Sequence, residues 1–201
     1  MYRCIESIKL QDGQFFRLSF HQQRINQSFK SCYPGFAPFN LSELLETTNY
    51  PETGLYKYRI IFDHQTQETE FAPYKMRKIE SLKLVETSAQ THDYKNEDRA
   101  EIDRAFAQRR ECDDVIMVKN GMLTDTSYAN IALFDGEKWY TPRIPVLYGT
   151  NRASLIAENK IIEKDLKSND INHFSRIRIF NAMIEFGEIE LNCAAIENNL
   201  Y

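Results

Sequence analysis

The chain has 201 residues, of which 42% are hydrophobic, enough to fill a core without disulfide bonds. Its net charge of -4 is spread along the chain, so nucleic acid and membranes are not expected partners and a small molecule fits better. It has no signal-peptide run and no apolar stretch of about eighteen residues that could cross a bilayer. The sequence therefore predicts a cytoplasmic protein whose four scattered cysteines stay reduced.

The first half of the chain reads as strands and short helices. Alternating residues from Cys4 to Leu10 predict a strand, Asp12-Gly13 predicts a turn, and the segment carrying His21, Arg24 and Ile25 predicts a helix. A helix is expected at 41–46, and strands are expected at 56–62, 68–74 and 79–86.

The second half has a different order of elements. We expect a helix at 98–110, a strand at 114–119 turning at Asn120-Gly121, a hairpin about Asp135-Gly136, a helix at 152–164 and a strand at 177–180. These elements predict an α+β fold of two subdomains, a small one at 1–89 and a larger one at 90–201. A cofactor would be expected in the cleft between two such subdomains.

No metal site, phosphate loop or nucleophile elbow is recognisable. The signal is instead a series of weak motifs in a fixed order. They are His21-Gln22-Gln23-Arg24-Ile25, Tyr94-Lys95-Asn96-Glu97-Asp98-Arg99, Thr124-Asp125-Thr126-Ser127-Tyr128-Ala129-Asn130-Ile131, Tyr140-Thr141-Pro142, Leu147-Tyr148-Gly149-Thr150-Asn151-Arg152 and Phe180-Asn181-Ala182-Met183.

This series resembles the class IV enzymes that depend on pyridoxal phosphate (PLP), which include branched-chain and D-amino acid aminotransferases and 4-amino-4-deoxychorismate lyase. The resemblance implies a fold of the D-amino acid aminotransferase type, with PLP in the cleft between the two subdomains. It also implies a homodimer that acts on a small amino substrate.

Two residues carry the expected chemistry. By the resemblance, Lys95 is the catalytic lysine that bonds to the cofactor and then moves a proton at the substrate carbon. Asp125 stands where the family usually has Glu, beside the pyridine nitrogen, and a turn aspartate is the alternative interpretation.

The remaining cofactor-binding residues are expected to surround the phosphate. Backbone amides at Gly149, Thr150 and Asn151 precede a predicted helix and suit an anion. The resemblance adds the charge of Arg24 and a second loop at Asn181 and Ala182, and it includes Tyr128 among the cofactor-binding residues.

Substrate recognition is the weakest part of the pattern. Arg59 on the strand at 56–62 is a candidate for binding a substrate carboxylate, and a surface arginine is an equal alternative. By the resemblance, the family's usual segment before the first strand is expected to be absent. Ile5 stands where a hydroxyl is common, so Thr126 or Tyr128 would have to relay a proton.

Three functions stay open. The leading hypothesis is a lyase that converts 4-amino-4-deoxychorismate to pyruvate and 4-aminobenzoate, a folate precursor, because Lys95-x-x-Asp98-Arg99 and Asn181-Ala182-Met183 resemble that enzyme's motifs. The alternatives are an aminotransferase for branched-chain or D-amino acids with a 2-oxo acid acceptor, and a non-catalytic family member that binds PLP or a metabolite.

Overall fold

The computed structural model describes residues 3–198 and divides into two compact units. The first unit contains the chain up to Met76 together with His92–Asp98, and the second contains Arg77–Thr91 and the chain from Arg99 onward. The expected boundary at 89/90 falls inside a segment of the second unit. The chain thus crosses between the units more than once, because distant strand pairing and not local composition decides which unit a segment joins.

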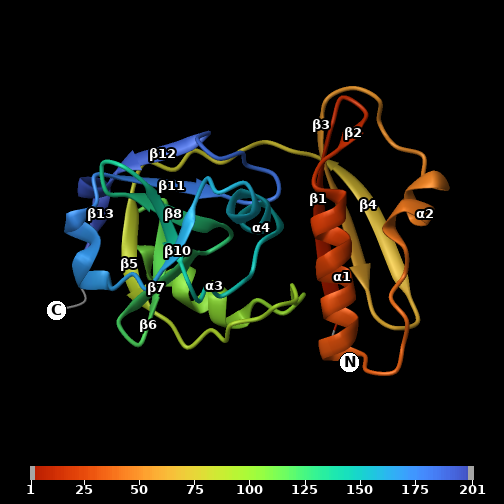
Figure 1. The fold of residues 1–201 in the computed structure, drawn as a ribbon, viewed down its shortest axis with the longest axis horizontal. Coiled ribbons are helices and arrows are strands. Elements are labelled where there is room, and N and C mark those ends of the chain that lie inside the picture. Colours follow the sequence, from red (N-terminus) through yellow and green to blue (C-terminus); the bar gives the residue numbers. More distant parts are fainter. Residues whose placement is uncertain (1–2, 199–201) are drawn as a thin grey trace. The chain divides into compact units, whose positions relative to one another are not determined.

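In the first unit, four antiparallel strands form a sheet in the order β2-β1-β3-β4 (Figure 1). Helix α1 covers one face of this sheet, and a buried cluster that includes Ile8, Ile25, Phe29 and Ile60 fills the space beneath it. The elements are β1 (Cys4–Gln11), β2 (Gln14–Phe15), α1 (Leu18–Cys32), α2 (Leu41–Glu46), β3 (Leu55–Phe62) and β4 (Gln67–Pro73).

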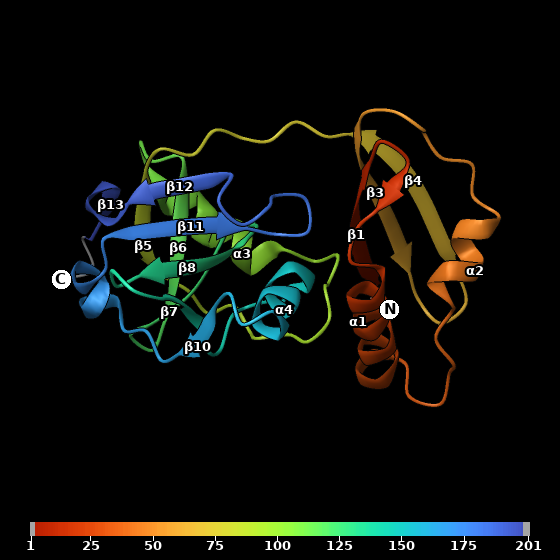
Figure 2. The ribbon, with the colours of Figure 1, turned by 45° about the horizontal axis from the view of Figure 1, so that its top comes forward.

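The second unit contains two further sheets, visible in Figure 2, in the orders β10-β9-β8-β11-β12 and β13-β5-β6-β7. Its strands are β5 (Leu82–Glu86), β6 (Asp114–Lys119), β7 (Met122–Thr126), β8 (Asn130–Phe134), β9 (Trp139–Pro142), β10 (Ile162–Lys164), β11 (Arg176–Phe180), β12 (Ile189–Asn192) and β13 (Ile196–Glu197). Its helices are α3 (Ala100–Phe106), α4 (Thr150–Ala157) and the 3-10 helices Ala107–Arg109, Ser168–His173 and Cys193–Ala195.

The helix expected at 152–164 is wrong in its second half. Helix α4 ends at Ala157, and Ile162–Lys164 instead forms β10, which runs parallel to β9. The backbone of Asn159 prevents the helix from continuing, because its φ of 57° lies in the left-handed region that asparagine tolerates. The Lys160 amide donates to the Leu155 carbonyl at 2.9 Å, which closes the last turn and satisfies one of its open carbonyl groups.

Within residues 3–198, no helix is long and apolar enough to cross a membrane.

Candidate active site

Lys95 lies at the edge of the first unit's sheet, beside β1. The Ile5 amide donates to the Lys95 carbonyl at 2.8 Å, and the Glu97 amide donates to the Arg3 carbonyl at 3.0 Å. Cys4 and Asn96 form an antiparallel bridge between these two bonds. The segment 95–97 is thus paired like a short strand, which fixes the backbone from which the Lys95 side chain extends.

The Lys95 side chain reaches one face of β1. Its Nζ donates to the hydroxyl oxygen of Ser7 at 3.0 Å. Ser7 lies directly opposite Arg59 of β3, so the structure brings Lys95 and Arg59 to the same face of the sheet. Arg59 already pairs there with Glu70 at 3.4 Å and with Glu97 at 4.0 Å.

Ser7 is a candidate site residue that the sequence interpretation missed. The resemblance expects a hydroxyl at the position of Ile5, and the period-2 alternation of the strand places Ile5 and Ser7 on one face. That alternation was the available signal, but only the pairing of the distant Lys95 segment with β1 shows that this is the relevant face.

Arg24 belongs to α1, and its side chain reaches the face of β1 opposite to that of Ser7. Its Nε and Nη2 donate to the two carboxylate oxygens of Glu6 at 2.8 and 2.7 Å, and Nδ1 of His21 lies 2.5 Å from Glu6 Oε2. Burial raises the pKa of Glu6, but the charges of Arg24 and His21 and their hydrogen bonds outweigh it and hold that pKa at about 2. Burial lowers the pKa of His21, against the charge of Glu6, which raises it.

In the second unit, Asp125 is held at the end of β7 with both carboxylate oxygens bonded. Asn130 Nδ2 donates to Oδ1 at 2.8 Å, and the Leu147 amide donates to Oδ2 at 2.8 Å. Burial, at 4% exposure, raises the pKa of Asp125 to about 6 even though these donors lower it. The carboxylate is therefore mainly ionised at neutral pH and lacks the solvation of a surface turn aspartate.

Gly149 is needed for the packing of this cluster. A Cβ on Gly149 would lie 2.1 Å from Asn130 Oδ1, which is closer than real Cβ atoms approach any neighbour. Asn130 also donates to the Leu147 carbonyl at 2.9 Å, so it ties Asp125 to the loop that leads into α4. Asn130 belongs to one of the recognised motifs, yet sequence alone does not show this positioning role.

The two loops expected to surround a phosphate lie together. Asn151 in the first turn of α4 donates through Nδ2 to the Asn181 carbonyl at 2.8 Å and to the Ile184 carbonyl at 3.0 Å. Asn181 folds its own loop by accepting from the Ile184 amide at 3.0 Å, and it donates to the Tyr128 carbonyl at 3.2 Å. Ala182 lies within that turn.

The start of α4 presents the amides of its first turn. The first helical bond runs from the Ala153 amide to the Gly149 carbonyl at 2.9 Å, so the amides from Thr150 to Arg152 point out of the helix end. Such an end attracts anions through its dipole and its N–H groups. The second unit therefore holds together Asp125, Tyr128, Gly149, Thr150, Asn151, Asn181 and Ala182.

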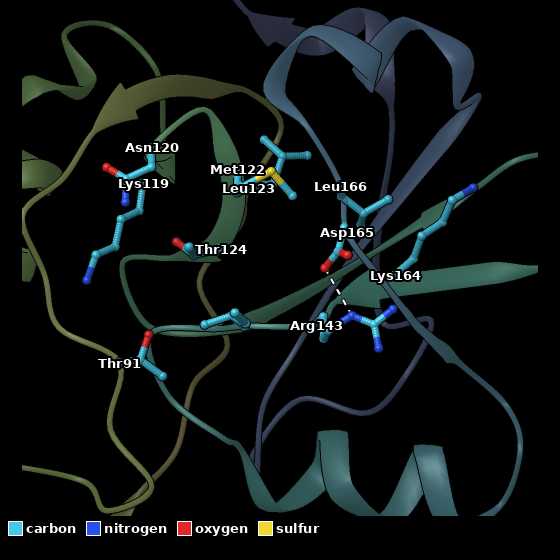
Figure 3. Close-up of a pocket in the computed structure, with 11 residues that line it drawn as sticks. Thr91, Lys119, Asn120, Met122, Leu123, Thr124, Arg143, Lys164, Asp165 and Leu166 are labelled. Atoms are coloured by element: carbon cyan, nitrogen blue, oxygen red, sulfur yellow. Dashed lines mark hydrogen bonds and ion pairs between the residues drawn. The ribbon is translucent and has the colours of Figure 1, made fainter.

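A separate hollow of about 300 Å³ lies beside β7 (Figure 3). Met122 and Leu166 are among its apolar lining residues, whereas its cations already have partners. Lys119 donates to a backbone carbonyl at 2.9 Å, and Arg143 donates to Asp165 at 3.0 Å. The hollow is not lined by any of the predicted site residues.

Comparison with known proteins identifies the family to which this chain is similar. The family model of amino-transferase class IV matches residues 3–190. An uncharacterized protein of Haemophilus influenzae is 33% identical over 91% of this chain and 98% of its own length. A protein of Schizosaccharomyces pombe that is provisionally named aminodeoxychorismate lyase is 24% identical over 86% of this chain and 83% of its own.

Solved structures are also similar to this chain. The crystal structure of a protein from Haemophilus somnus, provisionally named 4-amino-4-deoxychorismate lyase, superposes with a TM-score of 0.84 at 29% identity, over 92% of this chain and 98% of that one. The branched-chain aminotransferase of Thermoproteus uzoniensis superposes with a TM-score of 0.75 at 18% identity, over 98% and 78%.

The chain belongs to the class IV aminotransferase family. The α+β fold class, the family and the enzyme class inferred from the motif series are thus confirmed. The roles of the individual site residues stay predictions, and the structure supplies their surroundings.

Proposed function

We propose that the chain is a PLP-dependent lyase that converts 4-amino-4-deoxychorismate to pyruvate and 4-aminobenzoate. The relatives from Schizosaccharomyces pombe and Haemophilus somnus support this proposal through their provisional names. The observation that carries it is the hydroxyl of Ser7, 3.0 Å from the Lys95 amine. A lyase needs both a base for the substrate carbon and a proton donor for the departing oxygen.

The described residues fit the cofactor. Lys95 offers the amine that would hold it, and Asp125 offers a buried carboxylate that is ionised at neutral pH and suits a protonated ring nitrogen. Amides at the start of α4 and the loop at Asn181 would bind its phosphate. When bound, PLP would supply an electron sink that makes the substrate carbon acidic.

Arg24 is proposed as the charged phosphate ligand, a role that its guanidinium would combine with its buried pair with Glu6. Nε and Nη2 are committed to Glu6, so the guanidinium would reach the phosphate through Nη1. The fixed pair with Glu6 would keep that nitrogen in one orientation.

The reaction would use two side chains of the first unit in sequence. The Lys95 amine would take the proton from the ring carbon that bears the amino group, and the Ser7 hydroxyl would pass a proton to the oxygen of the departing enolpyruvyl group. Their hydrogen bond lets Ser7 recover its proton from Lys95 directly, without free water.

The test is to supply 4-amino-4-deoxychorismate to the PLP-loaded protein and to measure 4-aminobenzoate and pyruvate together. We expect equal amounts of both without any 2-oxo acid, no product with Lys95→Ala, and a rate lowered roughly 10²-fold or more with Ser7→Ala but largely kept with Ser7→Thr. Ser42→Ala, at an exposed position of α2, is the matched control.

Three results would contradict the proposal. Ser7→Ala acting like the wild type would remove Ser7 from the reaction. Transfer of an amino group from leucine or D-alanine to 2-oxoglutarate, with no 4-aminobenzoate formed, would favour the aminotransferase alternative. Failure of the protein to take up PLP would leave only a non-catalytic member that binds another metabolite.

A further inference from the structure

The turn that joins β7 to β8 is held by a carboxylate at the start of β6. Asp114, the first residue of β6, is fully buried. Its Oδ2 accepts from the Ser127 hydroxyl at 3.0 Å, and its Oδ1 accepts from the Ser127 amide at 3.3 Å and from the Val115 amide at 2.7 Å. One carboxylate thus binds both hydrogen-bond donors of a single turn residue.

Burial makes this carboxylate sensitive to the positions of its donors. Burial raises the pKa of Asp114, although the donors at Val115 and Ser127 lower it. The nearest cation, the half-exposed guanidinium of Arg77, lies 3.9 Å from Oδ2, beyond hydrogen-bond distance. A buried charge is disfavoured unless several donors hold it in one geometry, so the carboxylate and the Ser127 turn fix each other's position.

The shape of the turn and its position have different causes. Its own bonds close it, such as the one from the Thr126 amide to the Ala129 carbonyl at 2.9 Å. These internal bonds do not attach the turn to β6, whereas the bonds from Ser127 to Asp114 do. The Arg99 guanidinium also donates to the Ser127 carbonyl at 2.8 Å. Every polar group of Ser127 is therefore used to place the turn.

The next residue of the turn contacts a loop that is proposed to bind the cofactor phosphate. The Tyr128 carbonyl accepts from Asn181 Nδ2 at 3.2 Å, and the Asn181 carbonyl accepts from Asn151 Nδ2 in the first turn of α4 at 2.8 Å. Asp114 is therefore connected through Ser127 and Tyr128 to both loops of the proposed phosphate site. All of these residues belong to the second unit.

We propose that Asp114 is a positioning residue for the cofactor phosphate. It would act without touching the phosphate, by holding the turn from which the Tyr128 carbonyl fixes the Asn181 loop. The inference rests on the proposed binding of PLP, but not on the reaction that follows. Without the Asp114 carboxylate the Asn181 loop would lose its fixed support, whereas Asp125 keeps its own donors. The loss should therefore fall on the phosphate contacts.

Binding of PLP and of pyridoxal, which lacks the phosphate, tests the proposal without turnover. Calorimetry on the cofactor-free protein would give both dissociation constants for each variant. We expect Asp114→Ala to lower the preference for PLP over pyridoxal about tenfold, the size of one lost hydrogen bond, with little change for pyridoxal. Asp114→Asn keeps an acceptor for the two amides and should lose less. Ser127→Ala removes only the hydroxyl and should also lose part of the preference.

The neighbouring aspartate supplies the matched control. Asp113 accepts from the amide and hydroxyl of Ser81 at 3.0 and 3.2 Å, and within residues 3–198 it forms no hydrogen bond to the Ser127 turn. Asp113→Ala should lower the free energy of unfolding and keep the wild-type preference for PLP. In an Asn181→Ala background, Asp114→Ala should change the preference little further, because the contact through which it acts is gone.

Three results would overturn the proposal. They are a wild-type preference for PLP in Asp114→Ala, an equal loss of affinity for PLP and pyridoxal, and a full further loss in the Asn181→Ala background. If Asp114→Ala does not fold, the same measurements on Ser127→Ala decide. A reduced preference in a protein that releases no 4-aminobenzoate from aminodeoxychorismate would support the positioning role and reject the proposed reaction.

Discussion

Burial and hydrogen bonding shift the pKa of the Asp125 carboxyl group in opposite directions. Burial raises its pKa to about 6, and the donors at Leu147 and Asn130 keep it from rising further. A buried charge whose nearest partners are neutral donors is costly unless a cation joins it. The charge of Arg152 already lowers this pKa in part. A protonated ring nitrogen would be a further cationic partner, in keeping with the role proposed for Asp125 beside the cofactor.

Gly149→Ala tests whether Asn130 holds Asp125 in place. The added Cβ would have to displace the Asn130 amide from a position 2.1 Å away, so we expect a loss of about 1–3 kcal/mol in the free energy of unfolding and weaker PLP binding. Denaturant unfolding and a PLP titration would measure the two effects.

The double variant Gly149→Ala/Asn130→Ala identifies the cause. Without the Asn130 amide the new Cβ has space, so the alanine at 149 should cost less stability there than in the wild-type background. Additive losses in the two variants would mean that Gly149 matters for another reason.

The sequence predicts individual site residues, whose roles stay predictions, but it does not predict the contacts between them. Lys95, Asp125 and the loop at Gly149 were singled out because they stand in ordered motifs. Ser7 and Asn130 were not assigned roles, because their importance depends on which distant segment packs against them. A motif gives residue types at intervals along the chain, and it does not give pairing across space.

At the scale of elements, α1 is joined to β1 by a buried charged group. Arg24 and His21 on the helix both reach Glu6 on the strand. This cluster explains why the motif His21-x-x-Arg24 is polar on a helix face that otherwise enters the core. It also makes Arg24 a residue with two separable roles, one in folding and one proposed for the cofactor phosphate.

Arg24→Met should lower the free energy of unfolding by about 3–5 kcal/mol, because it leaves Glu6 charged and buried without its main partner. Adding Glu6→Gln removes that charge and should restore part of the loss. Both variants lack the guanidinium, so both should need more PLP for half-saturation, with a smaller change in the rate at saturating PLP. Wild-type PLP affinity in the double variant would show that Arg24 serves the fold alone.

Element boundaries show where local sequence is insufficient. Most strands of both units follow alternation and turn residues, and the structure has them where expected. The segment 152–164 was mistaken because its apolar spacing continues past Ala157, whereas Asn159 ends the helix by a backbone conformation that spacing does not encode. Strand β10 then depends on its partner β9, which lies earlier in the chain.

At the scale of the whole molecule, the two units differ in how acid should affect them. In the first unit, Glu6 has a pKa of about 2 against an ordinary 4.5, so its stabilising effect is complete above 4.5 and is lost as the pH falls toward 2. His21, whose pKa burial lowers, adds a loss in the same direction below its ordinary 6.5. The Glu6 difference corresponds to about 3 kcal/mol.

The second unit contains buried carboxyls of the opposite kind. Burial raises the pKa of Asp125 from 3.8 to about 6 and also raises that of Asp114. A raised carboxyl pKa means that the folded form takes up its proton first, so stability increases as the pH falls from 6 toward 3.8. For Asp125 the gain is again about 3 kcal/mol.

Acid should therefore unfold the first unit at a higher pH than the second. Helix α1, the longest of the described helices, belongs to the first unit and dominates its far-ultraviolet circular dichroism. The chain's one tryptophan, Trp139, packs against Phe134 in the second unit.

In an acid titration between pH 6 and 2, we expect the helical signal to fall before the Trp139 fluorescence changes. Glu6→Gln should start less stable and show a weaker dependence on pH below 4.5, because the titrating carboxyl is gone. Coincident midpoints for the two signals in the wild type would mean that the two units unfold together. The opposite pKa shifts of Glu6 and Asp125 would then not give the units different stabilities in acid.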